Sequence, residues 1–558
     1  MKEMDSYFRW AELAVEDADI AAELHEIRNE PGQIHDRFYR GLEFGTGGLR
    51  GLLGAGSNRM NIYTVRQATR GLAEYLLSCF RAPSVAIAYD SRHKSQDFAL
   101  EAAKVLSRCG IAVNIFGRLM PTPALSFAVR QLGCSAGVMI TASHNPAVYN
   151  GYKVYGSDGC QITEKAAESI MRLISDVDPF DCLCTGREAA PVDTIPESLH
   201  ELYYQAVLEQ RVMKDPQPSA LSVVYTPLNG SGLAPVTDIL RKAGYADVKV
   251  VPSQAMPDGD FPTCPYPNPE LPETLQEGIK LCRESGADII LATDPDCDRV
   301  GVAVPDGRGH RILTGNEVGA LLLDYVCMMR RQTAAMPESP IAIKTIVTTD
   351  MAGRIAKQYG VSLLNVLTGF KYIGETIGKL EKTGEAERFI FGFEESCGYL
   401  SGIYARDKDA VNACLLICDM AAYYLGKGLT LAQKMDLLYE AYGHYACALD
   451  SFEFGGEEGV LAMRGIMKSF RDGSSKVLAK LPVRCCIDYL MDDTQAGALP
   501  RSDVLQYVFM DDTLLTVRPS GTEPKMKVYY QVVRATREQA EEALAKLRGR
   551  IKTAVAAR

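Results

Sequence analysis

The chain has 558 residues, a length that corresponds to roughly four domains of ordinary size. Hydrophobic residues make up 47% and charged residues 23%, which are the proportions of globular proteins and exclude a disordered, collagen-like or disulfide-scaffold chain. The net charge is -10, from 60 basic and 70 acidic residues, and it disfavours nucleic acid or an anionic membrane as the main partner. An anionic small substrate remains compatible with this charge if the cleft that binds it is locally basic.

No segment is typical of a membrane span or an export signal. The most apolar stretch, residues 410–425, contains Asn412 and Asp419 and is shorter than the roughly 18 apolar residues of a span, so it predicts a buried helix. The first residues, MKEMDS, lead into an acidic amphipathic stretch. The sixteen cysteines contain no Cys-x-x-Cys pair, and we interpret most of them as small core residues in a reducing compartment. We therefore expect a cytoplasmic protein.

In chain order, a helical arm over residues 5–40 precedes a pattern of strand, helix, strand, helix, strand that occurs three times. The first copy comprises residues 84–89, 97–108, 111–116, 122–132 and 136–141. The second comprises residues 221–225, 233–243, 248–251, 273–285 and 288–292. The third comprises residues 341–347, 351–359, 362–366, 372–380 and 389–393. The last hundred residues instead contain strand patterns and a closing helix.

Several segments punctuate this pattern. Linkers are expected near residues 215–218 and 337–340, where prolines cluster. Residues 252–272 contain seven prolines and predict an ordered loop without helix or strand. The closing helix is expected to begin after a capping box formed by Thr536 and Gln539.

The alternation of strands and helices predicts an α/β fold in which helices cover both faces of each sheet. Ligands in such folds bind beyond the carboxyl ends of strands. The segments to search are therefore those that follow the third strand of each copy: residues 141–146, 293–299 and 394–396.

Three aspartates lie in one of these segments, as Asp294-x-Asp296-x-Asp298. Their carboxylates are hard oxygen ligands of the kind that Mg²⁺ and Ca²⁺ prefer. The loop is not an EF-hand, because Arg299 and Pro305 replace the glycine and glutamate that an EF-hand needs. The alternative is a solvated acidic turn.

A serine follows the third strand of the first copy, in the turn Ser143-His144-Asn145-Pro146. A hydroxyl nucleophile there suits acyl or phosphoryl transfer. The hydrolase motif Gly-x-Ser-x-Gly is absent, and ligands of the magnesium type favour phosphoryl chemistry. The alternatives are that Ser143 caps a helix and that His144 is structural.

Two further segments carry polar groups on flexible backbone. Arg518-Pro-Ser-Gly-Thr combines a guanidinium with two hydroxyls and predicts a phosphate site, the alternative being a β-turn with ordinary surface residues. The glycine-rich segment that ends at Arg50 matches neither a P-loop nor a dinucleotide fingerprint and could be only a turn.

Taken together, four motifs in this order resemble the α-D-phosphohexomutase superfamily: TASHNPAVYNGYKVY, DPDCDR, FEES and RPSGTEP. The resemblance covers essentially the whole chain. The N-terminal arm, the GTGGLRG segment and the length are most similar to the phosphoglucomutase type 2 branch, which also contains phosphopentomutases. The resemblance implies three similar α/β domains with mixed sheets and a smaller α+β domain around a central cleft. The implied domain ranges are 1–212, 213–328, 329–448 and 449–558.

The resemblance also implies roles for particular residues. Ser143 would carry the transferable phosphate, and Asp294, Asp296 and Asp298 would bind Mg²⁺ together with a phosphoserine oxygen. Arg50 matches an arginine near the phosphoserine, and His144 and Lys153 match positions implicated in proton transfer. The implied substrate-binding residues are Arg299, Thr368, Gly369, Glu394, Ser396 and Lys408 in the central cleft, and Arg518, Ser520, Gly521 and Thr522 at a distal phosphate site.

The activity implied is interconversion of glucose 1-phosphate and glucose 6-phosphate, with Mg²⁺ as cofactor and hexose 1,6-bisphosphate as activator. Phosphopentomutase, phosphomannomutase, sugar-bisphosphate synthase and a non-catalytic sugar-phosphate sensor are the alternatives. Phe393 replaces the glycine that commonly precedes the sugar-binding glutamate, which leaves the choice of sugar open. The sequence also leaves open the oligomeric state and the identity of the general acid and base.

Overall fold

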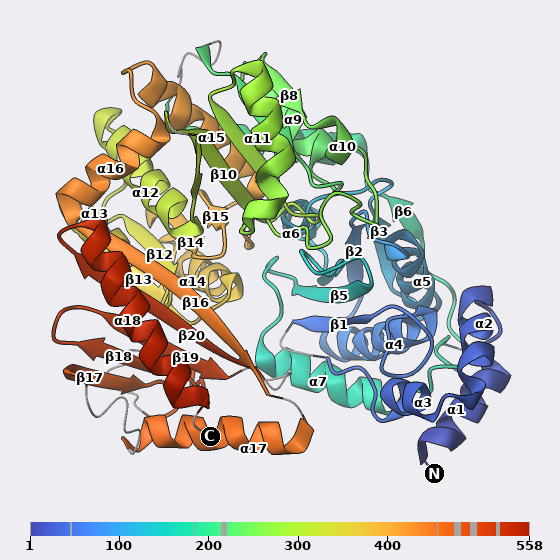
Figure 1. Ribbon diagram of the computed structural model, residues 1–558. Coiled ribbons are helices and arrows are strands. Elements are labelled where there is room, and N and C mark those ends of the chain that lie inside the picture. The colour runs from blue at the N-terminus through green and yellow to red at the C-terminus, as the bar shows by residue number, and fades with distance from the viewer. Residues whose placement is uncertain are drawn as a thin grey trace.

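The computed structural model describes residues 2–44, 47–184, 186–213, 220–307, 309–454, 456–473, 481–491, 499–519 and 525–556. The chain forms three α/β domains and a sheet-rich C-terminal domain (Figure 1). Residues of all four line a central cleft of about 1120 Å³. Among the described residues, no helix has the length and apolarity needed to cross a bilayer.

The predicted N-terminal arm is helical and packs against the first domain. Trp10 inserts between the rings of Phe38, Tyr63 and Phe180, with centroid distances of 5.2 to 5.9 Å. Pro31 occupies the first turn of its helix, where the missing N–H costs no hydrogen bond. The elements of the arm are α1 (Lys2–Leu13), α2 (Ala18–Glu26), the 3₁₀ turn η1 (Ile27–Asn29) and α3 (Pro31–Phe38).

The first domain contains a mixed sheet of order β1-β5-β4-β2-β3-β6. Its central strand β2 is parallel to β3 and β4, whereas β5 runs antiparallel to β4. The strands are β1 (Gly48–Leu52), β2 (Ser84–Tyr89), β3 (Ala112–Ile115), β4 (Ala136–Ile140), β5 (Tyr149–Gly156) and β6 (Val192–Thr194). The helices are α4 (Ile62–Cys79), α5 (Ser95–Arg108), α6 (Thr122–Gln131), α7 (Glu164–Ser175) and α8 (Glu197–Leu208).

The second and third domains repeat the central part of this topology. In all three sheets the first strand of the copy lies between the second and the third, parallel to both, and an antiparallel strand follows the third. The second domain contains β7 (Val223–Thr226), β8 (Val248–Val250), β9 (Ile289–Thr293), β10 (Val300–Pro305), β11 (His310–Leu313), α9 (Leu233–Lys242), α10 (Pro252–Ala255), η3 (Pro272–Leu275) and α11 (Gln276–Ser285). From α12 onward the chain forms α12 (Gly315–Gln332), β12 (Ile341–Thr345), α13 (Met351–Tyr359), β13 (Ser362–Val366), α14 (Phe370–Lys382), η4 (Ala386–Arg388), β14 (Phe389–Glu394), β15 (Gly398–Leu400), α15 (Ala410–Leu425) and α16 (Leu431–Tyr442). The predicted threefold pattern is therefore confirmed.

The predicted buried helix is α15, which packs between elements of the second and third domains. Asn412 and Asp419 are fully buried and both are hydrogen-bonded. Asp419 forms a bidentate ion pair with Arg211 at 2.9 Å, which satisfies its charge inside the core.

The C-terminal domain is an antiparallel sheet of order β16-β20-β19-β18-β17 with two helices. Because successive side chains of a strand point to opposite faces, one face of β20 packs Met526, Val528 and Tyr530 against these helices. The other face presents Lys527 and Tyr529 to the central cleft. The elements are β16 (His444–Glu453), α17 (Gly456–Arg471), β17 (Val483–Asp488), β18 (Leu505–Phe509), β19 (Leu514–Pro519), β20 (Lys525–Arg534) and α18 (Arg537–Ala556). Before α18, the Gln539 N–H donates to Thr536 Oγ1 at 3.3 Å, which is one of the two hydrogen bonds of the predicted capping box.

Two predictions need correction in part. The proline-rich stretch is not wholly irregular, because α10 begins at Pro252, whose fixed φ suits the first turn of a helix. The prediction that most cysteines are core residues is confirmed, but Cys79 and Cys486 are exposed, and the buried Cys109 forms a disulfide with Cys184 instead of a free thiol. Their separation of 75 residues carries no spacing signal.

One of the two predicted linkers lies within the described residues, and two of the implied domain boundaries fall inside a helix or a strand. Residues 337–340 are an irregular connection between α12 and β12, and the predicted linker at 215–218 lies outside the described residues. The boundaries implied at 328/329 and 448/449 fall inside α12 and β16. A division that keeps both elements intact would lie outside Gly315–Gln332 and before His444, so the domain ranges stay a proposal.

Candidate active site

The three segments that follow the third strands, β4, β9 and β14, converge on the central cleft. Each contains one non-glycine residue in the left-handed region: Ser143 (φ 53°), Cys297 (φ 50°) and Cys397 (φ 62°). Such a conformation is uncommon for residues other than glycine and costs roughly 1 to 2 kcal/mol. The same strained bend thus turns the chain sharply at the cleft in all three domains.

Ser143 is buried and lies against the metal-type loop. Its Oγ donates to Asp294 Oδ2 at 3.0 Å and lies 3.1 Å from His144 Nδ1. Its N–H donates to Thr141 Oγ1 at 2.8 Å. No helix begins at this serine, so the alternative of a helix cap is wrong.

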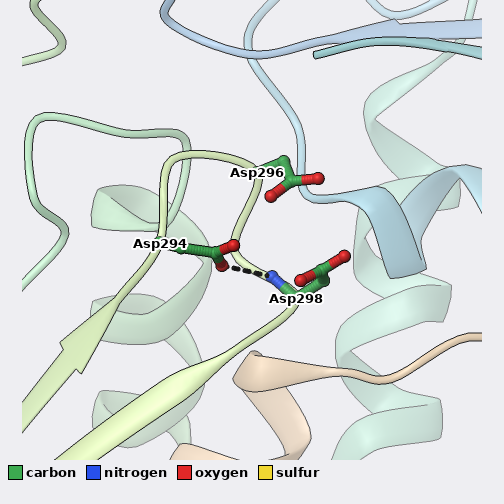
Figure 2. Close-up of side chains that lie close together, drawn as sticks. All are labelled: Asp294, Asp296 and Asp298. Carbon is green, nitrogen blue, oxygen red and sulfur yellow. Dashed lines mark hydrogen bonds between the residues drawn. The ribbon is translucent and has the colours of Figure 1, made fainter. Parts of the chain in front are cut away.

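The three aspartates are buried together rather than solvated, so the alternative of a solvated turn is wrong. Figure 2 shows them extending from one loop, with the Asp298 N–H donating to Asp294 Oδ1 at 3.0 Å. Their candidate ligand atoms all lie within 4.8 Å of one another. Asp296 Oδ1 and Asp298 Oδ1 have no hydrogen-bond partner, and buried carboxylate oxygens of this kind normally coordinate a cation or accept a bond. This donor set fits a hard divalent cation.

Two lysines border the aspartates. Lys153 Nζ on β5 lies 2.7 Å from Asp296 Oδ2, and Lys408 Nζ lies 2.9 Å from Asp298 Oδ2. Burial alone would raise the pKa of Asp296, but the Lys153 ammonium holds it below its ordinary value. Burial and the charge of Asp296 raise the pKa of Asp294 and of Asp298. The two ammonium groups thus offset part of the negative charge of the loop.

Arg299 follows the aspartates and joins the second and third domains. Its Nη1 donates to Glu270 Oε1 at 2.8 Å and to the Ser396 carbonyl at 3.1 Å. Glu270 lies in the proline-rich stretch and lines the cleft, a position that the sequence reasoning missed. The prolines in the sequence predicted an ordered loop. They did not indicate where this loop lies relative to the cleft.

His144 and Arg50 lie beside the serine. Arg50 Nη1 donates to Asn145 Oδ1 at 3.3 Å. Burial and the nearby charges of Arg299 and Arg50 lower the pKa of His144 well below its ordinary value. The imidazole is therefore neutral at physiological pH, with Nδ1 facing the hydroxyl of Ser143.

The predicted sugar-facing residues Thr368, Gly369, Glu394 and Ser396 all line the cleft. Ser396 Oγ donates to Glu394 Oε1 at 3.1 Å, and Thr368 Oγ1 is buried without a partner. Phe393 is 1% exposed, points away from the cleft and packs against Gly319, where an added Cβ would lie 2.1 Å from the ring. The unusual residue before Glu394 therefore does not contact the space where a ligand would bind.

At the far end of the cleft, Arg518 on β19 lies directly across from Lys527 on β20. Both line the cleft, and no ion pair joins either to a carboxylate within the described residues. Burial and the charges of Arg518 and Arg299 lower the pKa of Lys527. Like charges on opposite positions of paired strands are destabilising, so this end favours an anion. Ser520, Gly521 and Thr522 lie outside the described residues.

The sequence reasoning missed other residues around the site. Arg92 lies beneath the serine turn, and Glu395 accepts hydrogen bonds from Thr345 and Thr348 at 3.1 and 3.2 Å. Arg92 follows the end of β2 by three residues, so the rule that ligands lie beyond strand ends could have included it. Lys527 depends on strand register, which no sequence signal fixes.

Comparisons with known proteins show the family to which the chain belongs. Family models described as phosphoglucomutase/phosphomannomutase α/β/α domains I, II and III match residues 41–179, 201–307 and 314–442. A phosphoglucomutase of Staphylococcus aureus (strain bovine RF122 / ET3-1) is 36% identical over 531 residues, covering 93% of this chain and 94% of that protein.

Solved structures share the fold. Parafusin, a phosphoglucomutase from Paramecium in an open form, has a TM-score of 0.67 at 17% identity and covers 91% of this chain and 94% of its own. An N-acetylphosphoglucosamine mutase of Aspergillus fumigatus in complex with GlcNAc-6P and magnesium has a TM-score of 0.51 at 14% identity, with 92% and 96% covered.

The fold and the site define a phosphomutase, an enzyme of the isomerase class. The chain belongs to the phosphoglucomutase/phosphomannomutase family, within the α-D-phosphohexomutase superfamily.

Proposed function

We propose that this enzyme interconverts glucose 1-phosphate and glucose 6-phosphate through a phosphorylated Ser143 and a glucose 1,6-bisphosphate intermediate. The observation that carries the proposal is the hydrogen bond of 3.0 Å from Ser143 Oγ to Asp294 Oδ2. It joins the one hydroxyl at the bend after β4 to three buried carboxylates, at the bottom of a cleft that all four domains line. Glucose as the sugar rests on the name of the Staphylococcus relatives.

The cofactor proposed is Mg²⁺, held by Asp294, Asp296, Asp298 and a phosphoserine oxygen. Bound there, the ion would supply positive charge to the phosphoryl oxygens during transfer. The relative from Aspergillus was solved with magnesium, and the donor set of this chain fits the same ion.

The chain's own residues divide the remaining work. The phosphoryl group passes from Ser143 Oγ to a free hydroxyl of the sugar, so the P–Oγ bond breaks as the new P–O bond forms. The sugar hydroxyl loses its proton to a neighbouring base, and Ser143 regains one. His144, neutral and 3.1 Å from Oγ, and Lys153, 2.7 Å from Asp296, are the candidates for these proton transfers. Arg50 and Arg299 add positive charge beside the reacting group.

The substrate's second phosphate would bind at the far end of the cleft. Arg518 provides a forked donor and Lys527 a second cation opposite it. Ser520, Gly521 and Thr522 are proposed to complete this site. Glu394, Ser396, Thr368, Gly369 and Lys408 would bind the sugar between the two ends. Because only one phosphate can reach Ser143, the bisphosphate must turn around before the return transfer, and hexose 1,6-bisphosphate would activate enzyme that has lost its phosphate.

A kinetic panel tests the proposal. Glucose, mannose, ribose and glucosamine phosphates are compared with Mg²⁺ and a trace of hexose 1,6-bisphosphate present. The highest kcat/KM is expected for glucose 1-phosphate. A preference for ribose 1-phosphate would establish a phosphopentomutase instead, and accumulation of bisphosphate without mutase product would establish a synthase. If none of these sugar phosphates is turned over, the remaining interpretation is a non-catalytic sugar-phosphate sensor.

A further inference from the structure

A buried arginine outside the cleft organises the loop that carries the reactive serine. The loop comprises residues 141–149, from the end of β4 to the first residue of β5, and we call it the serine loop. Arg92 lies in the segment that follows β2, its side chain has no exposed surface, and it does not line the cleft. It therefore cannot touch a substrate there directly.

The guanidinium of Arg92 gathers four carbonyl groups of the serine loop. Nη2 donates to the carbonyls of Ser143 and Asn145, both at 2.5 Å. Nη1 donates to the carbonyls of Pro146 and Tyr149, at 2.9 and 3.1 Å. The charged, forked guanidinium of arginine is one of the few side-chain groups that can donate hydrogen bonds to so many acceptors at once. Without it, the carbonyls of Ser143 and Asn145 would lose this donor, whereas the Pro146 carbonyl also accepts from the Tyr149 N–H at 3.0 Å.

The charge of Arg92 is balanced within the same network. Its Nε lies 3.3 Å from Asp90 Oδ2 as an ion pair without a hydrogen bond, and this oxygen accepts a hydrogen bond from Thr141 Oγ1 at 2.6 Å. Thr141 Oγ1 in turn accepts the Ser143 N–H at 2.8 Å. Arg92 and Asp90 thus hold the carbonyl and the N–H of Ser143 from two directions.

The hydrogen bonds from Arg92 and from the Asp90–Thr141 pair act on Ser143, whose backbone conformation is strained. Ser143 has a φ of 53°, and a non-glycine residue keeps such a conformation only where its surroundings impose it. The conformation places Ser143 Oγ 3.0 Å from Asp294, in another domain. Phe261, from that second domain, stacks its ring 5.0 Å from the Arg92 guanidinium carbon and closes the far side.

We propose that Arg92 is a positioning residue that holds the serine loop in the conformation in which Ser143 accepts and donates phosphate. This rests on the proposed role of Ser143. Lysine keeps the charge but cannot donate to four carbonyls in a plane. Arg92→Lys should therefore relax the bend and move Oγ, and displacements near 1 Å can cost about 100-fold in rate.

The test compares Arg92→Lys with Arg66→Lys, a matched control. Arg66 is also a buried arginine of the first domain, and it pairs with Glu16 and Glu101 at 2.8 and 2.7 Å, not with the serine loop. Phosphorylation of Ser143 by glucose 1,6-bisphosphate is followed by rapid quench, beside kcat, KM and thermal unfolding. In Arg92→Lys the phosphorylation rate and kcat should fall together by about 10- to 100-fold, with KM within about threefold of wild type. Arg66→Lys should keep both rates within about twofold.

Two further measurements separate positioning of the serine loop from a general loss of structure. Hydrogen exchange of the serine-loop amides should quicken in Arg92→Lys and not in Arg66→Lys, a result that does not depend on phosphate transfer. Low-millimolar guanidinium should restore part of the kcat of Arg92→Ala where equal potassium chloride does not, and if Arg92→Ala does not fold, Arg92→Lys decides alone. Wild-type rates and exchange in Arg92→Lys, or equal losses in both lysine variants, would overturn the role of Arg92. Failure of wild-type Ser143 to take up phosphate would overturn the proposed function instead, leaving hydrogen exchange to decide on Arg92.

Discussion

The two ends of the cleft are charged in different ways. At the serine end, most of the cations have a carboxylate partner: Lys153 with Asp296, Lys408 with Asp298, and Arg299 with Glu270. At the far end, in the C-terminal domain, Arg518 and Lys527 face each other across paired strands, and neither forms an ion pair within the described residues. The serine end is therefore assembled before substrate arrives, whereas the other end becomes complementary only when it holds an anion.

This difference suits a reaction in which chemistry occurs at one end only. Preorganised charges at the reacting centre need no rearrangement during transfer. An end that only has to hold a phosphate, and must release it when the intermediate turns around, gains from cations whose mutual repulsion an anion relieves. Substitutions at the two ends should accordingly affect different kinetic quantities.

The largest effect is expected for the serine itself. Ser143→Ala should lower kcat by about 10⁴-fold or more, because no other hydroxyl occupies the bend beside Asp294. Intact-mass analysis after incubation with hexose bisphosphate should show one added phosphate on wild type and none on the variant. Equal phosphate uptake by both proteins would remove Ser143 from the mechanism.

The next largest effect concerns the aspartates. Asp296→Asn should raise the Mg²⁺ concentration needed for half-maximal activity by about 10- to 100-fold, because a hard anionic ligand becomes neutral. The unfolding temperature should change little, since the loss of the Lys153 ion pair is offset by relief of repulsion among three buried carboxylates. Activity is measured against Mg²⁺ concentration, with the exposed Asp260→Asn as control. An unchanged Mg²⁺ profile would contradict a metal site at this loop.

At the other end of the cleft, Arg518→Ala should lower kcat/KM by about tenfold to a hundredfold, the equivalent of a lost charge-assisted bond of roughly 1.5 to 3 kcal/mol. The variant should also release more free bisphosphate per turnover, since the intermediate has lost an anchor while it reorients. Bisphosphate and mutase product are followed together. Arg484→Ala, which loses only a half-exposed pair with Asp512 at 2.9 Å, serves as the control. Wild-type values for both quantities would exclude Arg518 from the distal site.

A smaller effect is expected for Lys527, the lysine opposite Arg518 at the far end of the cleft. Lys527→Gln should raise KM by about three- to tenfold with kcat nearly unchanged, and it should weaken the salt dependence of substrate binding. The same substitution should stabilise the substrate-free protein slightly, because it removes a like charge opposite Arg518. KM against ionic strength and thermal unfolding measure the two effects. A fall in kcat without a change in KM would place Lys527 at the reacting end instead.

The smallest effect is a pH dependence of stability at Glu395. Burial and the charge of Glu394 raise the pKa of Glu395 to about 7. Since the folded pKa lies above the ordinary value of 4.5, this group favours the folded state most below pH 4.5, and the contribution is lost as pH rises through 7. The unfolding temperature of the wild-type protein should therefore fall between pH 5 and pH 8. In Glu395→Gln this fall should be smaller by roughly a few degrees. An identical pH profile in both proteins would contradict the raised pKa.

The sequence predicted the repeated strands and the loops that follow them, because apolar runs bounded by polar turns have few other interpretations. It also named most residues that the structure brings together at the serine end. It could not predict Lys527 beside Arg518, which depends on the register of β19 and β20, or Glu270, which depends on the path of the proline-rich stretch. Nor could it predict the Cys109–Cys184 disulfide, since sequence spacing does not report which distant cysteines meet.

The left-handed bends at Ser143, Cys297 and Cys397 show how one backbone shape can serve three purposes. In the first domain the bend places a buried hydroxyl at the cleft, in the second it gathers carboxylates, and in the third it follows Glu394, which lines the cleft. Because the geometry belongs to the backbone, the chemistry of each corner is set by side chains alone. The specificity of such an enzyme can therefore change at one corner of the cleft while the other two keep their architecture.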